Sequence, residues 1–429
     1  MNDGGYVLRA ATVVTGDSVL SPGWLAVRAG SVVGVGEVAT GGAPGGSGSG
    51  GSGSGGLKGL SSAATGPVID LGERIVAPGY FDVHVHGGDG AQVNGERVEE
   101  VSASVARIAR FHARHGTTSL LATTVSDTPE HLLTTVTAIG ETIARPIAGG
   151  AAVRGIHLEG PFIARAKMGA HDPLALRRAD VTELRQLAAA AGETVRMVTL
   201  APELAGASEV IAAACELGIA VAIGHTDADF DTTRSAIDAG ARHATHLFNA
   251  MAPLHHRRPG AVTALLLDDR VTLEVIADLE HIHPAVLELA ARCAPGRLVA
   301  VSDAVPAAGL EPGTYQIGRM EVSVEAGRVS LASDPATLAG SVLTMDVAVR
   351  NLVTVVGLPL DAAIRAASST PARAAGCDGD GLGTLRAGSP ADIVVLEPDL
   401  SVAATIVAGA AVFDSTGTLE VTTSAPPDA

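Results

Sequence analysis

Two histidines separated by a single valine, His84 and His86, are the first residues in the chain whose spacing could do chemistry. The stretch that begins at Phe81 alternates in the manner of a β-strand, which puts both imidazoles on one face. Gly87 and Gly88 follow directly and end the strand. Two imidazoles on one strand face can bind a divalent metal ion. A buried strand with two hydrogen-bonded histidines is the alternative, and an isolated His-x-His motif favours that alternative.

Four further polar residues favour a metal site, because each comes at the end of an apolar run typical of a strand. They are Glu159, His225, His246 and Asp303. Packing does not explain this pattern, since a buried polar group costs free energy unless it is satisfied. Imidazoles and carboxylates together suit Zn²⁺ or Fe²⁺ and leave a position open for water. The sequence therefore predicts a divalent metal centre.

Eight apolar, β-rich runs alternate with segments of helical period and must position these residues. The runs are Phe81–His86, Thr118–Val125, Val153–Glu159, Arg196–Pro202, Ala220–His225, His243–Asn249, Val271–Ala277 and Arg297–Asp303. Eight β–α repeats predict a closed, TIM-like (β/α)₈ barrel of the α/β class, in which the chemistry lies at the C-terminal strand ends. An open doubly wound sheet is the alternative. Beyond the eighth run, Gly318–Leu331 is typical of a hairpin with its turn at Ala326 and Gly327.

Short strands at both ends of the chain predict a small β-sandwich domain that residues 1–76 and 380–420 build together. Residues 77–379 then form the barrel. Residues 41–56 consist almost only of Gly and Ser, which predicts a flexible loop. Residues 421–429 are typical of a disordered tail.

Charge and composition narrow the possible partners. The 429 residues carry a formal net charge of −17, which argues against nucleic acid or an anionic membrane as a partner. The sequence contains no apolar run of about 18 residues that would span a membrane and no N-terminal signal pattern. Cys215, Cys293 and Cys377 are odd in number and far apart, which is typical of a reducing compartment. We therefore expect a cytoplasmic protein.

The order of these motifs resembles the amidohydrolase superfamily. Several longer stretches carry a narrower resemblance, to the N-acetylglucosamine-6-phosphate deacetylase family. They are Gly155–Phe162, Thr245–Met251, Arg258–Gly260, Leu338–Ser341 and Gly383–Asp392. The resemblance extends over roughly residues 5–415 and is interrupted by the Gly/Ser segment. It implies metal-dependent deacetylation of N-acetylglucosamine 6-phosphate to glucosamine 6-phosphate and acetate.

The resemblance also implies which residues hold the metal. Glu159, His225 and His246 match the ligands of a principal ion. His84 and His86 match the ligands of a second ion, which Glu159 bridges. Some members of the family lack this histidine pair and use one metal ion. The resemblance therefore implies one or two divalent ions per subunit, most often Zn²⁺ or Fe²⁺.

Asp303 matches the family's catalytic acid and base, and the chemistry supports this role independently. An acetamide is a poor electrophile, and a divalent ion both polarises its carbonyl and makes water nucleophilic near neutral pH. The amine leaves poorly unless it is protonated. One carboxylate should therefore take the proton from water and give it to nitrogen. A further role for Asp303 as a metal ligand is compatible with this one.

The implied substrate is a small amino-sugar phosphate bound by a homodimer. The residues that match its sugar contacts are Ala170, His171, Asn249, Ala250, Leu338, Ala339 and Gly340. Arg257 and His281 match the phosphate end, and the resemblance implies that Arg257 reaches the site of the neighbouring subunit. Arg257 belongs to the basic run His255–Arg258, and guanidinium suits bidentate phosphate contact. A solvated loop explains such a run equally well.

One departure from the family pattern leaves the substrate open. The family usually has Gly after the Asp of the seventh strand, whereas here Leu279 and Glu280 follow Asp278. Another N-acetyl hexosamine, such as N-acetylgalactosamine 6-phosphate or a sugar without phosphate, is therefore the alternative substrate. We expect strand alternation to stop at Asp278, so that Glu280 faces solvent and His281 faces inward. A catalytically silent relative is the alternative of a different class, and the complete ligand set argues against it.

Overall fold

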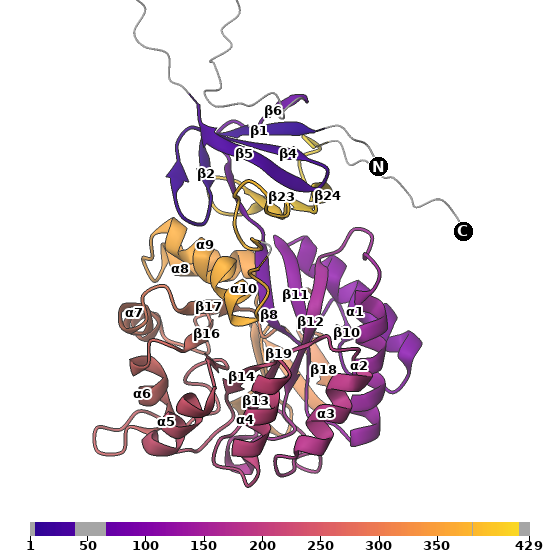
Figure 1. Cartoon of the computed structure of the whole chain (residues 1–429), viewed down its shortest axis with the longest axis vertical. Helices are drawn as coiled ribbons and strands as arrows, with labels where there is room; N and C mark the ends of the chain where they lie inside the picture. Colours follow the sequence, from indigo (N-terminus) through magenta and orange to yellow (C-terminus); the bar gives the residue numbers. More distant parts are fainter. Residues whose placement is uncertain (1–4, 39–65, 380, 420–429) are drawn as a thin grey trace, which may run out of the picture.

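A computed structural model describes residues 5–38, 66–379 and 381–419. The Gly/Ser segment and the C-terminal tail lie outside the described residues. Figure 1 shows a small β domain, drawn in indigo and yellow, above a barrel whose helices form an outer layer. The indigo and yellow strands come from opposite ends of the chain and lie together in the small domain.

The predicted (β/α)₈ barrel is confirmed. Its eight parallel strands pair in sequence order: β8 (Tyr80–Val85), β11 (Thr117–Thr124), β12 (Ala152–Glu159), β13 (Val195–Leu200), β14 (Ala220–Ile223), β15 (His243–Ala244), β16 (Thr272–Ile276) and β17 (Leu298–Val301). Backbone hydrogen bonds just beyond β17 close the circle. The Asp303 N–H donates to the His84 carbonyl at 3.0 Å, and the His86 N–H donates to the Ala304 carbonyl at 2.9 Å.

A helix follows each barrel strand and covers its outer side. These helices are α1 (Val98–Ala113), α2 (Pro129–Ile143), α3 (Val181–Ala190), α4 (Ala207–Glu216), α5 (Phe230–Ala239), α6 (Gly260–Leu267), α7 (Pro284–Cys293) and α8 (Met345–Thr354). Val101, Val105 and Ile108 recur at helical spacing on α1 and are buried against the sheet. Two further helices, α9 (Leu360–Ala367) and α10 (Ser369–Ala374), follow α8. Among the described residues, every helix is too short or too polar to cross a membrane.

The small domain consists of two sheets packed around Leu8, Leu25, Val76 and Ile393. One sheet has the order β5 (Ser31–Glu37), β4 (Gly23–Arg28), β1 (Tyr6–Ala10), β6 (Val68–Asp70). The other has the order β24 (Ala410–Asp414), β23 (Val402–Val407), β22 (Ile393–Leu396), β7 (Ile75–Pro78), β2 (Thr12–Val14), β3 (Val19–Leu20). Because β7 leads directly into β8, this sheet fixes the start of the first barrel strand (Figure 1).

A four-stranded antiparallel sheet between β17 and α8 extends the hairpin that the sequence predicts. It comprises β18 (Gly313–Ile317), β19 (Met320–Glu325), β20 (Arg328–Leu331) and β21 (Asp334–Leu338). The turn at Ala326 and Gly327 is confirmed, with φ of 50° and 85°. The outer strands escape sequence analysis because most of β18 and β21 is exposed and lacks an apolar alternation. Their ends, Ile317 and Leu338, line the cavity described below.

The fifth, sixth and eighth barrel strands end two to five residues earlier than the sequence predicts. The fifth ends at Ile223, the sixth at Ala244 and the eighth at Val301. The backbone turns into the left-handed region just afterwards, with φ of 48° at His225, 26° at His246 and 49° at Asp303. This region is uncommon for residues other than glycine and gathers at functional sites. The predicted strands are too long because residue type alone does not report this change of backbone direction.

Candidate metal centre and active site

A cavity of about 400 Å³ lies at the C-terminal ends of the barrel strands. Most of the predicted site residues line it: His86, Glu159, Ala170, His171, His225, His246, Asn249, Ala250, His281, Asp303, Leu338 and Gly340. His84 and Ala339 are buried immediately behind its wall. Arg257 is exposed and lies outside the cavity. The fold therefore brings together every predicted residue except Arg257.

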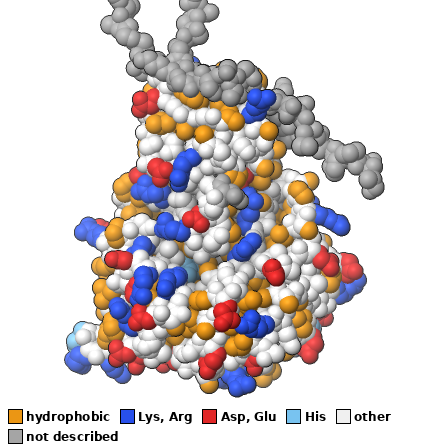
Figure 2. All heavy atoms as spheres, viewed as in Figure 1, with side chains coloured by type: hydrophobic (Ala, Val, Ile, Leu, Met, Phe, Trp, Pro, Cys, Tyr) orange, Lys and Arg blue, Asp and Glu red, His pale blue; other side chains and the backbone are white. Residues whose placement is uncertain are grey.

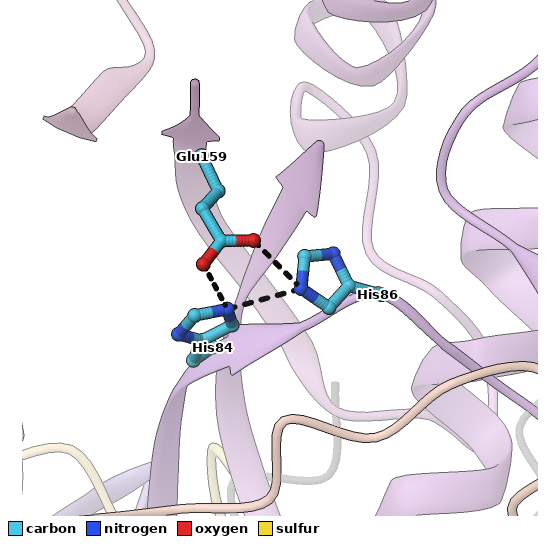
Figure 3. A group of neighbouring side chains, drawn as sticks. All are labelled: His84, His86 and Glu159. Atoms are coloured by element: carbon cyan, nitrogen blue, oxygen red, sulfur yellow. Dashed lines mark hydrogen bonds and ion pairs between the residues drawn. The ribbon is translucent and has the colours of Figure 1, made fainter. Parts of the chain in front are cut away.

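The Glu159 carboxylate is the centre of the cluster. It ends β12, and its Oε1 lies 3.1 Å from Nε2 of both His225 and His246. Those two nitrogens are 3.0 Å apart. Its Oε2 lies 3.2 Å from Nε2 of His86, and Oε1 lies 3.5 Å from Nε2 of His84. Figure 3 shows Glu159 reaching from its strand toward the two imidazoles of β8 and the residue after it.

The second ring nitrogens fix the tautomers of three of these histidines. Nδ1 of His86 donates to the Thr123 carbonyl at 3.1 Å, and Nδ1 of His225 donates to the Lys167 carbonyl at 2.7 Å. Nδ1 of His84 donates to the Glu274 carboxylate at 3.0 Å. Since carbonyl and carboxylate oxygens only accept, these Nδ1 atoms hold the protons and leave Nε2 as a lone pair in each neutral ring. In the neutral rings these lone pairs converge on the Glu159 carboxylate, an arrangement that a bound cation would stabilise.

The electrostatics of the cluster favour positive charge at the same atoms. Burial by itself lowers the pKa of His86, but the carboxylates of Asp303 and Glu159 outweigh burial and raise that pKa to about 9. Burial opposes charge on His84 as well, yet Glu159, Glu274 and Asp303 raise its pKa well above the ordinary value. Protons and a divalent ion compete for such nitrogens. The donor set therefore fits a divalent ion at Glu159, His225 and His246, and another at His84, His86 and Glu159.

Two residues of the cavity, Asp303 and His171, face this centre and differ in protonation state. Asp303 Oδ1 lies 3.2 Å from Nε2 of His86, and histidines hold the pKa of Asp303 below its usual range although burial raises it. The Ser126 N–H donates to Nδ1 of His171 at 3.1 Å, so Nε2 carries the proton of the neutral ring. Burial lowers the pKa of His171 to about 4. At neutral pH the cavity thus offers a carboxylate acceptor and a neutral imidazole donor.

Sequence analysis missed Glu274, which lies in the middle of β16 and is fully buried. Besides His84, it accepts hydrogen bonds from Nε2 of His243 at 2.8 Å and from the backbone N–H of His246 at 3.0 Å. Although burial raises its pKa, His84 and His243 hold that pKa well below the usual range. A glutamate inside an otherwise apolar strand was the available signal, since an unpaired buried charge is costly.

A second missed residue is Lys167, one of two lysines in the chain. It lines the cavity, and its ammonium lies 3.6 Å from Asp227. Its carbonyl orients His225, as described above. No motif signalled this contact, because a backbone acceptor leaves no trace in the residue type.

The loop after β16 has the expected orientation. Asp278 accepts from the backbone N–H of His281 at 2.9 Å and from its Nδ1 at 2.6 Å. Leu279 has φ of 72°, which ends the strand alternation. Glu280 is exposed, whereas the His281 side chain is 5% exposed and lines the cavity. The two predicted directions are therefore confirmed.

Arg257 belongs to the basic run that leads into α6. Its Nη1 lies 2.8 Å from Nε2 of His256, and both side chains are exposed. The His255 and His256 rings are stacked with centroids 4.5 Å apart. In Figure 2 histidine and basic side chains gather at the lower left edge, over the loop that Figure 1 draws between α5 and α6. Elsewhere on this face, acidic and basic side chains are interspersed (Figure 2).

Comparison with known proteins gives consistent relatives. Residues 75–412 match the amidohydrolase family. The chain is 42% identical to the N-acetylglucosamine-6-phosphate deacetylase of Homo sapiens, over 81% of this chain and 85% of that protein. It is 40% identical to the N-acetylgalactosamine-6-phosphate deacetylase of Escherichia coli O157:H7, over 79% of this chain and 89% of that protein.

A solved structure is also similar over nearly the whole chain. It is a mutant N-acetyl-D-glucosamine-6-phosphate deacetylase from Mycobacterium smegmatis in complex with N-acetyl-D-glucosamine-6-phosphate. The similarity covers 95% of this chain and 99% of the other, with a TM-score of 0.84 and 38% sequence identity.

Binding of a divalent ion should stabilise the folded chain, because the ligand residues come together only in the folded state. For protein stripped with a chelator, Zn²⁺ at about 100 times its dissociation constant should add about 2.7 kcal/mol of stability and raise Tm. Glu159→Ala should remove most of this rise, while His131→Ala, on α2, should keep it. An equal rise in Glu159→Ala, measured by calorimetry with metal analysis, would show that the ion binds elsewhere.

Proposed function

This chain belongs to the amidohydrolase family, among the N-acetylglucosamine-6-phosphate deacetylases, and on that premise we propose that it hydrolyses N-acetylglucosamine 6-phosphate to glucosamine 6-phosphate and acetate. The observation that carries the proposal is the cluster of Glu159, His225 and His246 at a cavity that Asp303 and His171 also line. The proposal makes the protein a hydrolase that acts on a linear amide bond.

Family membership implies a divalent metal ion, and the described residues offer groups able to bind one. We propose Zn²⁺ or Fe²⁺ as that ion, because imidazole and carboxylate ligands suit both. Glu159, His225 and His246 would hold the principal ion, and His84 and His86 would hold a second ion. When bound, such an ion supplies Lewis-acid chemistry, by which it polarises the amide carbonyl and makes water nucleophilic near pH 7.

Asp303 is the group that moves protons in this proposal. Its carboxylate lines the cavity and is ionised at neutral pH, so it can accept a proton from the attacking water. It can then give the proton to the nitrogen as the C–N bond breaks, and glucosamine 6-phosphate leaves as a neutral amine. The Ser341 N–H donates to the Asp303 carbonyl at 2.8 Å and holds this turn in place.

His171 is the group that orients the amide. Its neutral ring has Nε2–H as the donor, because Ser126 occupies Nδ1 through both its backbone N–H and its hydroxyl, the latter at 2.8 Å. This N–H lies 3.2 Å from Oε2 of Glu159 and can instead donate to the carbonyl oxygen of the substrate, where negative charge develops as water adds. A neutral donor suits this task, since it need not titrate during turnover.

We propose that the phosphate binds at the mouth of the cavity through His281 and through Arg257 of the partner subunit in a homodimer. His281 is held by Asp278, which leaves Nε2 free of that contact. Arg257 is exposed beside other basic side chains, as a residue that reaches into a neighbouring subunit must be. The three cysteines are free, which supports our proposal of a cytoplasmic location.

N-acetylgalactosamine 6-phosphate is the second candidate substrate. It is favoured by the 40% identity with the deacetylase of that sugar from E. coli O157:H7. Leu279, in the loop after β16, also departs from the glycine that is usual in the N-acetylglucosamine-6-phosphate deacetylase family. Acetate release from both sugar phosphates by the purified protein separates the two candidates, and the glucosamine derivative should be hydrolysed faster.

Asp303→Asn should retain the principal ion and a similar Tm but lower kcat by about 10²- to 10⁴-fold, because the general acid and base is lost. Metal content and acetate release are measured on the same preparation. If the variant kept wild-type kcat with the ion bound, another group would have to move the protons.

Mixed dimers test the contribution of Arg257 across the subunit interface. Arg257→Ala should lower kcat/KM by about tenfold, the share of one charge-assisted hydrogen bond, and Asp303→Asn should be nearly inactive. After subunit exchange the mixture should regain activity, since one of the two sites in a mixed dimer has both residues intact. Exchange is verified with differently tagged subunits. Absence of recovery would place Arg257 in its own subunit's site or outside the mechanism.

The 6-phosphate should raise kcat/KM by about 10²-fold or more over free N-acetylglucosamine, equivalent to two charge-assisted hydrogen bonds. Glu280→Gly should change this ratio only modestly, because Glu280 is exposed. Both substrates are compared by acetate release. Equal turnover of the two sugars, with a preference appearing only in Glu280→Gly, would contradict the phosphate assignment.

A further inference from the structure

Behind the floor of the cavity, Glu274 joins the two halves of the candidate metal centre. We infer that Glu274 is a positioning residue that gives the His84 and His86 position its affinity for a second divalent ion. This inference rests on the proposed function for the identity of the site as a metal centre. It concerns a residue that the fold buries completely and that does not line the cavity.

The contacts of Glu274 leave it little freedom. Its Oε2 accepts from Nδ1 of His84 and from the backbone N–H of His246, both at 3.0 Å. Its Oε1 accepts from Nε2 of His243 at 2.8 Å. The Nδ1 atom of His243 lies 2.6 Å from Oγ1 of Thr272, which fixes the far end of the network. The Glu274 carboxylate thus holds the ring of His84, a candidate ligand of the second ion. It also holds the turn at His246, a candidate ligand of the principal ion.

Among the three histidines whose tautomer is fixed, only His84 has its Nδ1–H bound by a side chain, that of Glu274. His86 and His225 donate Nδ1–H to backbone carbonyls, which any residue at those positions would supply. His84 donates to a side chain, and its ring is fully buried. Without Glu274, the contact that directs the Nε2 lone pair of His84 toward Glu159 would be lost. A partner of this kind orients a ligand and raises its basicity.

The charge of Glu274 acts in the same direction. Three carboxylates that contact these imidazoles are buried, namely Glu159, Asp303 and Glu274. A single divalent ion would neutralise only two of these three negative charges. The remaining negative charge, held behind His84 rather than in the cavity, favours a second cation on the His84 side. Glu274 therefore supplies both orientation and charge to the second position.

Glu274→Gln separates charge from shape. The glutamine oxygen can accept from His84 and from the His246 N–H as Oε2 does. Its amide can donate to His243, whose proton moves to Nδ1 and is accepted by Thr272. Hydrogen bonding is thus preserved while the negative charge is lost. Asp82→Asn is the matched control, because Asp82 is also fully buried and its Oδ1 accepts the backbone N–H groups of His84 and Ser302, which asparagine can also accept.

The experiment is a titration of the chelator-stripped protein with Co²⁺, followed by metal analysis and by the Co²⁺ absorption spectrum. Wild type should bind two ions per subunit. In Glu274→Gln the first ion should bind as in wild type, whereas the affinity for the second should fall about 10- to 100-fold. Asp82→Asn should bind both ions as wild type does. If Glu274→Gln does not fold, Glu274→Asp replaces it, since its shorter carboxylate cannot reach all three donors and should also weaken the second ion.

Three results would overturn the inference: one ion per subunit in wild type, wild-type affinity for the second ion in the folded Glu274 variant, or equal weakening of both ions. Equal weakening would assign Glu274 a general structural role. The proposed function fails separately, if wild-type protein with both ions bound releases no acetate from either sugar phosphate. Selective loss of the second ion would support the role of Glu274 even in that case.

Discussion

The convergence of imidazole lone pairs on one buried carboxylate is the interaction on which the rest of this structure depends. A buried carboxylate has lost its hydration, so Glu159 among imidazole nitrogens favours positive charge at this point. The barrel can impose such an arrangement since its parallel strands all end at one mouth. Left-handed turns at His225, His246 and Asp303 then aim the side chains inward at a conformational cost.

The parts of the chain outside the barrel hold this centre in place. Arg154, on the strand that ends in Glu159, donates to the Asp392 carboxylate at 2.9 Å. Asp392 immediately precedes β22 of the small domain and also accepts the Ala408 N–H at 2.7 Å. The β18–β21 sheet contributes Ile317 and Leu338 to the cavity lining. A side chain at Gly340, just after this sheet, would approach Cγ1 of Val305 to 2.4 Å, so only glycine lets the backbone pass this close to Asp303.

Sequence reasoning predicted the barrel and most of the cavity because both depend on patterns that are local in the chain. An apolar run that ends in His225 or Asp303 carries its own signal. Glu274 was missed because a single charged residue in a strand has no periodic signature, and only the fold shows its three donors. Contacts through backbone carbonyls, such as that of Lys167, are invisible in residue types. A contribution of Arg257 to a partner subunit depends on how two subunits associate, and no residue pattern within one chain reports that association.

Anomalous X-ray diffraction from crystals of the metal-saturated protein tests the central claim most directly. The account predicts two anomalous peaks inside the barrel mouth. One should lie in bonding contact with Nε2 of His225 and His246, and the other with Nε2 of His84 and His86, with Glu159 touching both. Two ions at these positions would explain why so many imidazole and carboxylate groups are buried together. A metal-saturated crystal with no peak at Glu159, or with an ion held by other residues, would contradict the account.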